Sequence, residues 1–344
     1  MLRAELWWDE LSFGTFMAQE QYPPQSLLQY AYEAEKAGFD WIWTSDHFHP
    51  WFHSNASSGF AWVWIASALE RIHRVKIGTG VTAPYFRYHP AIVAQAFATL
   101  DNMYPGRVFL GVGMGEAMNE VPLGFDWPAT DERIRRFEEA IKIIKALWEG
   151  NFVDFNGHYF KLRSAKLYTL PTSKIPLIIA SNNHSVTFLA GRYADGWLTI
   201  YNKHRIDFIK NKLFKALEEG ARIEGRDPNR IKKCVHIVLS YDEDEDRALK
   251  ACKKWAASTV RQIFSSNIYD PRELERIAMM QTDDQLKENF LISSDTDTFV
   301  RIAIECVKMG FTHINFSSIS PNQSNFIKVF GEKVIPQIKD GVGV

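Results

Sequence analysis

The fold is decided by residues 74–113, RVKIGTGVTAPYFRYHPAIVAQAFATLDNMYPGRVFLGVG. Two short apolar runs, Val75–Val81 and Arg107–Val112, indicate strands that are buried on both faces of a sheet. Between them, Ala91–Asn102 has the spacing of an amphipathic helix, and it follows Pro90, a residue common at the start of helices. A strand, a helix and a second strand in this order predict a parallel unit.

The same pattern recurs along the whole chain. Further strands are predicted at Ser12–Met17, Trp41–Ser45, Pro176–Ala180, Gly196–Ile200, Lys233–Ser240 and His313–Ser317. Further helices are predicted at Gln25–Ala37, Phe60–Glu70, Asp131–Trp148, Ser185–Tyr193, Asp207–Glu224, Glu245–Ala257, Thr296–Met309 and Ser324–Ile338. Eight strand-then-helix units predict a closed parallel (β/α)8 TIM barrel that forms one domain over residues 1–344.

Two segments interrupt this pattern. FVDFNGHYFKL, residues 152–162, predicts a β-hairpin with Asn156-Gly157 in a type I′ turn. The stretch Ser258–Asp295 is a long insertion before the last barrel strand. Insertions of that length are typical of lids, binding elements and dimer contacts.

Composition and charge exclude several classes of protein. The 344 residues carry 40 Lys and Arg against 41 Asp and Glu, so no excess of basic residues is available for nucleic acid or an anionic membrane. No apolar run approaches the roughly 18 residues of a membrane span, and the acidic N-terminal segment is unlike a signal peptide. Three scattered cysteines, Cys234, Cys252 and Cys306, form neither a disulfide framework nor a metal-ligand spacing. We therefore expect a soluble, cytoplasmic protein.

Catalytic residues of an α/β barrel lie on the loops that follow the carboxyl ends of its strands. This rule selects four segments that carry chemically capable side chains: Ser45–His53, Gly78–Arg87, Gly113–Glu120 and Ser181–Ser185.

The first segment contains SDHFHPW, residues 45–51. His47 titrates near neutral pH and is suited to accept an alcohol proton, while the indole N–H of Trp51 is suited to a developing alkoxide oxygen. The structural alternative is that Asp46 caps the loop and the imidazoles are ordinary polar loop residues. A zinc site is a third possibility, but a matching third ligand is lacking in the sequence, so we predict no metal.

The second segment is GVGMGEAMNE, residues 111–120, and it lacks the glycine spacing and the later acid of a dinucleotide-binding fingerprint. Its glycines would let the backbone approach a bound ring. Glu116 is expected in the barrel mouth, where burial would raise its proton affinity. The structural alternative is an ion pair of Glu116 with Arg87 or Arg107.

The remaining two segments carry weaker signals. In IGTGVTAPYFRYHP, residues 77–90, the Gly80-Val81 junction could contact a ring face, and Arg87 could be only a loop clamp. In IIASNNHSVTFLAGR, residues 178–192, a strand leads into a helix whose N-terminus could hold a cofactor phosphate, although ordinary capping by Asn or Ser explains it equally well.

These segments resemble the bacterial-luciferase-like superfamily, and within it the branch that uses the deazaflavin coenzyme F420. The resemblance rests on residues 46–51, on RYHPAIVAQAFATL (87–100), on YPGRVFLGVGMGEAMNEVP (104–122) and on the hairpin aromatics. The members with the most similar motifs are secondary alcohol dehydrogenases of methanogenic archaea and glucose-6-phosphate dehydrogenases. The resemblance implies a luciferase-type (β/α)8 barrel with insertions, coenzyme F420 as cofactor and a homodimer.

The resemblance also implies roles for individual residues. His47 is the base or hydrogen-bonding group for the substrate hydroxyl, Trp51 lies beside the reacting oxygen, and Glu116 lies near the cofactor ring. We expect His47 and Glu116 to converge on opposite sides of that ring. The ring lies over Gly80-Val81, where the family has a non-prolyl cis peptide. The residues implied in cofactor binding are Asp46, Gly80, Val81, Gly115, Asn119, Ser181, Asn182 and Asn183.

The substrate follows from where the sequence departs from the family. Sugar-phosphate members hold the phosphate with cationic side chains at three positions. Lys203 matches one of them, whereas the other two fall on Ser265 and Asn289, with Arg261 and Lys287 as possible substitutes. A phosphate dianion would thus lose charge-assisted contacts of about 1.5–3 kcal/mol each. We expect a small neutral secondary alcohol that is oxidised to its ketone.

Other functions stay open at this point. They are a sugar-6-phosphate dehydrogenase, an FMN-dependent monooxygenase of the luciferase type, a non-catalytic cofactor-binding barrel and, more distantly, a reductase of a pterin-bound methylene group. Trp62 and Trp64, in the second predicted helix, supply either a dimer interface or core.

Overall fold

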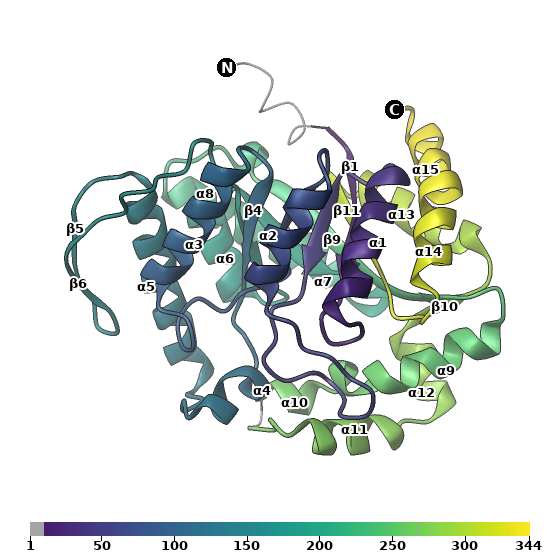
Figure 1. Ribbon diagram of the computed structural model, residues 1–344. Helices are drawn as coiled ribbons and strands as arrows, with labels where there is room; N and C mark the ends of the chain where they lie inside the picture. Colours follow the sequence, from purple (N-terminus) through teal and green to yellow (C-terminus); the bar gives the residue numbers. More distant parts are fainter. Residues whose placement is uncertain (1–9, 266) are drawn as a thin grey trace.

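A computed structural model describes residues 10–265 and 267–344 and shows a closed barrel of parallel strands (Figure 1). Of the three acids among the first ten residues, Glu10 is the one that lies within the described residues. The eight barrel strands are β1 (Ser12–Met17), β2 (Trp41–Thr44), β3 (Lys76–Thr79), β4 (Val108–Val112), β7 (Leu177–Ala180), β8 (Gly196–Ile200), β9 (Lys232–Tyr241) and β11 (His313–Ser318). They pair in the order β9-β11-β1-β2-β3-β4-β7-β8, and pairing of β8 with β9 closes the ring. The predicted barrel is confirmed.

Helices surround this barrel (Figure 1). They are α1 (Pro24–Lys36), α2 (Ala61–Arg71), α3 (Pro90–Met103), α5 (Thr130–Trp148), α6 (His184–Tyr193), α7 (Ile206–Phe208), α8 (Phe214–Ile223), α9 (Glu245–Trp255), α13 (Thr296–Lys308), α14 (Gln323–Val329) and α15 (Ile335–Val342). The short α4 (Ala117–Glu120) lies at one end of the barrel instead. A π-helical turn at Ile209–Leu213 joins α7 to α8, and another at Phe330–Val334 joins α14 to α15. The helices predicted there from sequence each run through such a turn.

Alternation along the strands separates two layers of core. On β2, Trp41 and Trp43 point into the barrel, where their rings lie 5.2 Å apart and that of Trp43 lies 4.6 Å from Phe109. Ile42, between them, packs in the larger cluster that joins the barrel to its helices. Successive side chains of a strand point to opposite faces, so each strand contributes to both layers.

The hairpin is confirmed, but the turn predicted for it is wrong. Strands β5 (Val153–Asn156) and β6 (Lys161–Ala165) pair antiparallel, and the connection runs from Gly157 to Phe160. Neither Asn156 nor Gly157 has the positive φ that a type I′ turn requires. The longer turn instead offers the backbone N–H groups of residues 158–160 to the carboxylate of Glu139 on α5. The Glu139 carboxylate is therefore the contact that shapes this turn.

The insertion before the last barrel strand is folded rather than extended. It contains α10 (Arg261–Ser265), α11 (Pro271–Met279), α12 (Asp283–Asn289) and β10 (Leu291–Ser293), which adds to the edge of β9. Figure 1 shows these helices at the same end of the barrel as α4. Trp51 and Phe52, from the loop after β2, pack with Leu274 and Leu286 in a cluster separate from the barrel core. The insertion therefore covers the mouth of the barrel together with that loop.

A partly buried histidine makes the stability of the barrel dependent on pH. His236 on β9 lies beside Phe16, with ring centroids 4.9 Å apart; its Nε2 atom is buried without a hydrogen-bond partner among the described residues, and this burial lowers its pKa to about 4. A histidine whose pKa is depressed in the folded state contributes stability above the unfolded value of about 6.5. That contribution is lost as the pH falls from about 6.5 towards 4, because the unfolded chain then binds the proton first.

We therefore expect His236→Phe to reduce the acid sensitivity of folding. Between pH 7.5 and pH 5 the wild-type imidazole accounts for a loss of about 2 kcal/mol in the free energy of unfolding. Urea denaturation at both pH values measures this loss, which should be smaller in His236→Phe by about that amount. The exposed His158, changed to Gln, is the control and should leave the loss unchanged. An equal loss in all three proteins would contradict the prediction.

Candidate active site

The predicted site residues gather at the end of the barrel covered by the insertion. His47 and Trp51 follow β2, and Glu116 and Asn119 follow β4. β2 and β4 both pair with β3 in parallel register, so their carboxyl ends meet at the same rim. The loops selected from the sequence therefore converge, as predicted from the barrel geometry.

His47 lies between two carboxylates. Its Nε2 atom is 4.0 Å from Oε2 of Glu116, and its Nδ1 atom is 3.3 Å from Oε1 of Glu20, a contact without hydrogen-bond geometry. Glu20 is almost fully buried at 2% exposure and also accepts a hydrogen bond from the hydroxyl of Ser45. An imidazolium formed at His47 would thus have a negative charge on each side.

Sequence reasoning missed Glu20. It follows the carboxyl end of β1, so the rule used for the other loops would have found it had that rule been applied to MAQE, residues 17–20. The isolated acid belongs to no recognisable motif, because its partner stands 27 positions later. The relation between Glu20 and His47 exists only in three dimensions.

The expectation that His47 and Glu116 flank a ring from opposite sides is wrong. A planar ring between two groups needs about 7 Å, since each side requires a van der Waals contact of about 3.5 Å. The 4.0 Å between Nε2 and Oε2 leaves no such room, so the two side chains present adjacent edges to the same space. Glu116 is also only partly buried, at 28% exposure, rather than enclosed as predicted.

Asp46 is saturated by contacts within the protein. Its carboxylate accepts hydrogen bonds from the hydroxyls of Thr82, at 2.6 Å, and Tyr88, at 3.0 Å, and lies 3.1 Å from Nη2 of Arg87. Beside this carboxylate burial raises the pKa of Tyr88, and Asp46 raises it further. Asp46 is 3% exposed, so its carboxylate fixes the loop after β2.

Arg87 does not pair with Glu116, and neither does Arg107. The partners of Arg87 are Asp46 and Glu120, and its Nη1 lies 2.6 Å from Oε1 of Glu120. Glu120 is fully buried and was not singled out from the sequence. Burial raises the pKa of Glu120, and the guanidinium of Arg87 opposes that rise. The loop clamp considered for Arg87 is therefore present, between two acids.

Trp51 and Asn119 complete the wall around His47. The Trp51 ring lies 6.1 Å from the His47 ring and 5.7 Å from Phe264 of the insertion, and within the described chain its indole N–H has no hydrogen-bond partner. Asn119 accepts a hydrogen bond from the backbone N–H of Phe48 and donates one to Glu116 at 3.1 Å. Trp51 thus keeps a free donor close to His47.

The Gly80-Val81 peptide is cis, as the resemblance implied. The glycines of GVGMG have a different explanation from the one predicted, because contacts within the protein require them. A Cβ on Gly111 would lie 1.9 Å from the Thr79 carbonyl oxygen, and one on Gly113 would lie 2.5 Å from Val81. Gly115 has a φ of +68°, a conformation that favours glycine.

The loop after β7 keeps its side chains for the fold. The hydroxyl of Ser181 contacts Thr187 and Trp197, and the amide oxygen of Asn182 accepts from Thr199. Asn183 caps α6 by accepting a hydrogen bond from a backbone N–H in its first turn. Ordinary capping is therefore confirmed, and only backbone N–H groups of the first turn are left to meet an anion.

Lys203 follows the carboxyl end of β8 and has its own counter-charge. Its Nζ atom is 3.6 Å from Glu288 on α12, which also lies 2.8 Å from the imidazole of His204. Asn289 ends the same helix. The side chains of Arg261 and Ser265 lie outside the described residues.

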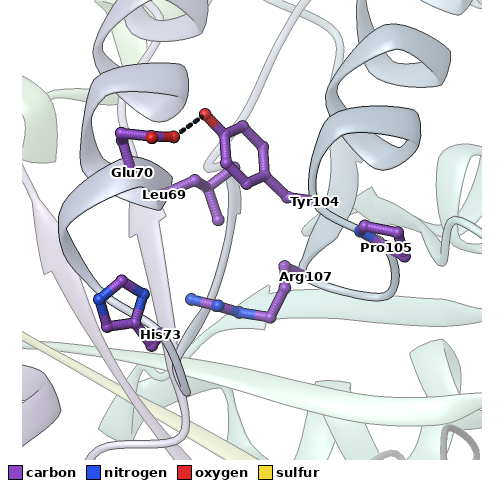
Figure 2. A pocket seen from close by; sticks show the side chains of 6 residues that line it. All are labelled: Leu69, Glu70, His73, Tyr104, Pro105 and Arg107. Carbon is purple, nitrogen blue, oxygen red and sulfur yellow. Dashed lines mark hydrogen bonds between the residues drawn. The ribbon is translucent and has the colours of Figure 1, made fainter.

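A pocket of about 340 Å³ lies at the ends where β3 and β4 begin (Figure 2). It is lined by Leu69, Glu70, His73, Tyr104, Pro105 and Arg107. None of the predicted site residues lies there. In the described part of the chain, no three His, Cys, Asp or Glu side chains group as metal ligands would, and no helix is long and apolar enough to cross a membrane.

Comparison with known proteins gives this geometry its family. A model of the luciferase-like monooxygenase family matches residues 11–313. This chain belongs to that family. It is 38% identical to an F420-dependent glucose-6-phosphate dehydrogenase of Microbacterium testaceum, over 96% of this chain and 98% of that protein. A second enzyme of the same name, from Beutenbergia cavernae, is 39% identical with the same coverage.

Two solved structures of F420-dependent enzymes have a similar fold. An F420-dependent secondary alcohol dehydrogenase in complex with an F420-acetone adduct superposes with a TM-score of 0.90 at 40% identity, covering 96% of this chain and 99% of that one. A coenzyme F420-dependent tetrahydromethanopterin reductase from Methanopyrus kandleri gives 0.78 at 26% identity, covering 96% and 100%. Both proteins share the luciferase-type barrel with this chain.

The close approach at Gly111 gives a direct test of this part of the rim. Gly111→Ala would force β3 and β4 apart, because the new Cβ meets backbone, and we expect it to lower the free energy of unfolding by about 1–3 kcal/mol or more. Gly341→Ala is the control, since its Cβ meets only the flexible end of Ile304 in a helix that favours alanine. Similar urea midpoints for the two variants would count against the strand contact.

Proposed function

We propose that this F420-dependent oxidoreductase removes a hydride from a small, uncharged secondary alcohol and releases the ketone. The observation that carries the proposal is the placement of His47, with Glu20 at Nδ1 and Glu116 near Nε2, beside the unpaired indole N–H of Trp51. Such a site provides one group to accept a proton and one donor for an oxygen that becomes negative.

The chain's own residues account for the proton in this reaction. As the carbinol C–H bond breaks, Nε2 of His47 accepts the hydroxyl proton and the C=O bond of the ketone forms. Glu20 and Glu116 stabilise the resulting imidazolium, and Trp51 donates to the substrate oxygen. The deazaflavin ring, when bound, supplies the carbon that accepts the hydride.

Several features of the site fit coenzyme F420. Val81, after the cis peptide, is partly exposed at the barrel mouth, and Gly115 and Asn119 lie on the adjoining loop. Backbone N–H groups at the start of α6, after Ser181–Asn183, fit a phosphate, because Asn183 satisfies only two of the four N–H groups of its first turn. Asp46 acts here through the loop that it fixes rather than through a free carboxylate.

A neutral alcohol is favoured over a sugar phosphate by charge. The lysine that matches a phosphate anchor, Lys203, already lies near Glu288, and a second anchor position carries the uncharged Asn289. A glucose 6-phosphate dehydrogenase is the second candidate, favoured by the names of the relatives from Microbacterium testaceum and Beutenbergia cavernae.

Assembly and location stay predictions. Trp62 and Trp64 both turn inward, with the Trp64 N–H bound to the carbonyl of Pro24, so the exposed apolar residues of α2 are instead Phe60, at its N-terminus, and Val63. We propose a homodimer through that face, which sedimentation velocity of the purified protein would check. A cytoplasmic location and an archaeal source are likewise predictions.

A substrate panel tests the proposed reaction. Under anaerobic conditions, oxidised coenzyme F420 with a series of secondary alcohols should lose its visible absorbance, with saturation in alcohol concentration. The kcat/KM for glucose 6-phosphate should be at least about tenfold lower than that for the best alcohol, as expected for one lost charge-assisted contact of about 1.5 kcal/mol. If the rate saturates with glucose 6-phosphate and with none of the alcohols, the substrate is the sugar phosphate and the proposed alcohol is wrong. Oxygen consumption with FMN would indicate a monooxygenase.

His47→Ala separates catalysis from cofactor binding. We expect kcat to fall about 10²–10⁴-fold through loss of the proton acceptor, while the F420 dissociation constant, measured by fluorescence titration, changes only a few-fold. His49→Ala is the matched control, because that imidazole contacts the Tyr269 carbonyl oxygen instead and should be dispensable. Loss of F420 binding in His47→Ala would remove His47 from the catalytic role.

A further inference from the structure

Arg87 joins the two loops that carry the reactive side chains. Its side chain is 6% exposed, and its guanidinium contacts Glu120 through Nη1 at 2.6 Å and Asp46 through Nη2 at 3.1 Å. Nη2 also donates to the backbone carbonyl of Asp46, and the backbone N–H of Arg87 donates to Oε2 of Glu120. One residue of the third loop therefore holds the loop after β2 and the loop after β4 at once.

Each end of this connection is adjacent to a residue of the reaction. Asp46 directly precedes His47, and Glu120 lies on the short α4 helix one turn after Glu116. Asn119 forms a second connection between the same loops, from the Phe48 N–H to the Glu116 carboxylate. A shift of either loop would change the 4.0 Å separation between His47 and Glu116.

We propose that Arg87 is a positioning residue, which sets the separation of His47 and Glu116 by bridging Asp46 and Glu120. This inference rests on the proposed function, in which His47 and Glu116 act together. It assigns to a residue outside the reacting set the task of holding that set in register.

The chemistry of the bridge requires arginine. A planar guanidinium presents donors in a fixed fork and can reach two carboxylates and a carbonyl oxygen together, whereas a lysine ammonium is a single point of charge on a flexible stem. Asp46 and Glu120 are buried, so removing their shared cation would leave two negative charges in a medium that solvates them poorly. Thr82 and Tyr88 would still hold Asp46, so the loss of Arg87 would be felt mainly as freedom between the two loops.

Arg87→Lys is the variant that tests the proposal, because it keeps the charge and loses the fork. Arg107→Lys is the matched control. Arg107 is also a partly buried guanidinium, bound to the carbonyl oxygens of Ile72 and Val75, but it lies in the pocket of Figure 2 where β3 and β4 begin. The measurements are the melting temperature, the F420 dissociation constant and the visible spectrum of bound oxidised F420. The kinetic measurements are KM for the alcohol, and kcat calculated from the concentration of protein that binds F420.

For Arg87→Lys we expect kcat per cofactor-binding site to fall by at least about tenfold, since small displacements of reacting groups are costly in rate. KM and the F420 dissociation constant should change less than about threefold, and the bound spectrum should shift. Arg107→Lys should lower the melting temperature to a similar degree without changing kcat or the spectrum. An unaltered kcat and spectrum in Arg87→Lys would overturn the proposal and leave Arg87 a merely structural residue.

A second variant and a second measurement are needed in case the first test fails. If Arg87→Lys does not fold, Glu120→Gln removes one ion pair at almost constant shape, and a kcat and spectrum equal to those of the wild type would overturn the proposal. If the wild type oxidises no secondary alcohol, the proposed function fails, but the spectrum of bound F420 still reports whether Arg87 orders the groups around it. The two failures are therefore distinguishable.

Discussion

The pairing of β8 with β9 is the constraint on which the rest of the structure depends, because it closes eight parallel strands into a ring. Closure brings the carboxyl ends of all strands to one rim, so that side chains far apart in sequence, such as Glu20 and Glu116, reach the same imidazole. The interior below this rim is filled by Trp41, Trp43 and their neighbours. The rim loops therefore rest on a packed floor rather than on an open channel.

Charge at the rim is distributed in two sets. One consists of His47 with Glu20 and Glu116, where a proton can be held between partners. The other consists of Arg87 with its two acids, a set in which the arginine remains permanently charged and whose task is mechanical. Because the two sets are adjacent, the same rim contains a histidine that can change its protonation and, beside it, an arginine whose charge does not change.

Sequence patterns predicted all eight barrel strands, the hairpin and the site loops after β2, β3 and β4, because burial on both faces leaves continuous apolar runs and the barrel fixes where their ends meet. They missed Glu20 and Glu120, since the partners of an isolated acid are set by the closed ring. The role of Gly111 was misassigned for a related reason: glycine in a sequence signals a close approach, but not what approaches. The hairpin turn depends on Glu139, an acid on another element that the local pattern could not include.

The cluster that unites Trp51 and Phe52 with Leu274 and Leu286 is separate from the main core. Exchange of Leu274 and Leu286 would consequently alter the cover over the barrel mouth while leaving the main core, to which neither side chain belongs, in place. A lineage could therefore vary this cover by mutation at little risk to the folding of the barrel. The architecture in this way separates evolutionary novelty from structural inheritance.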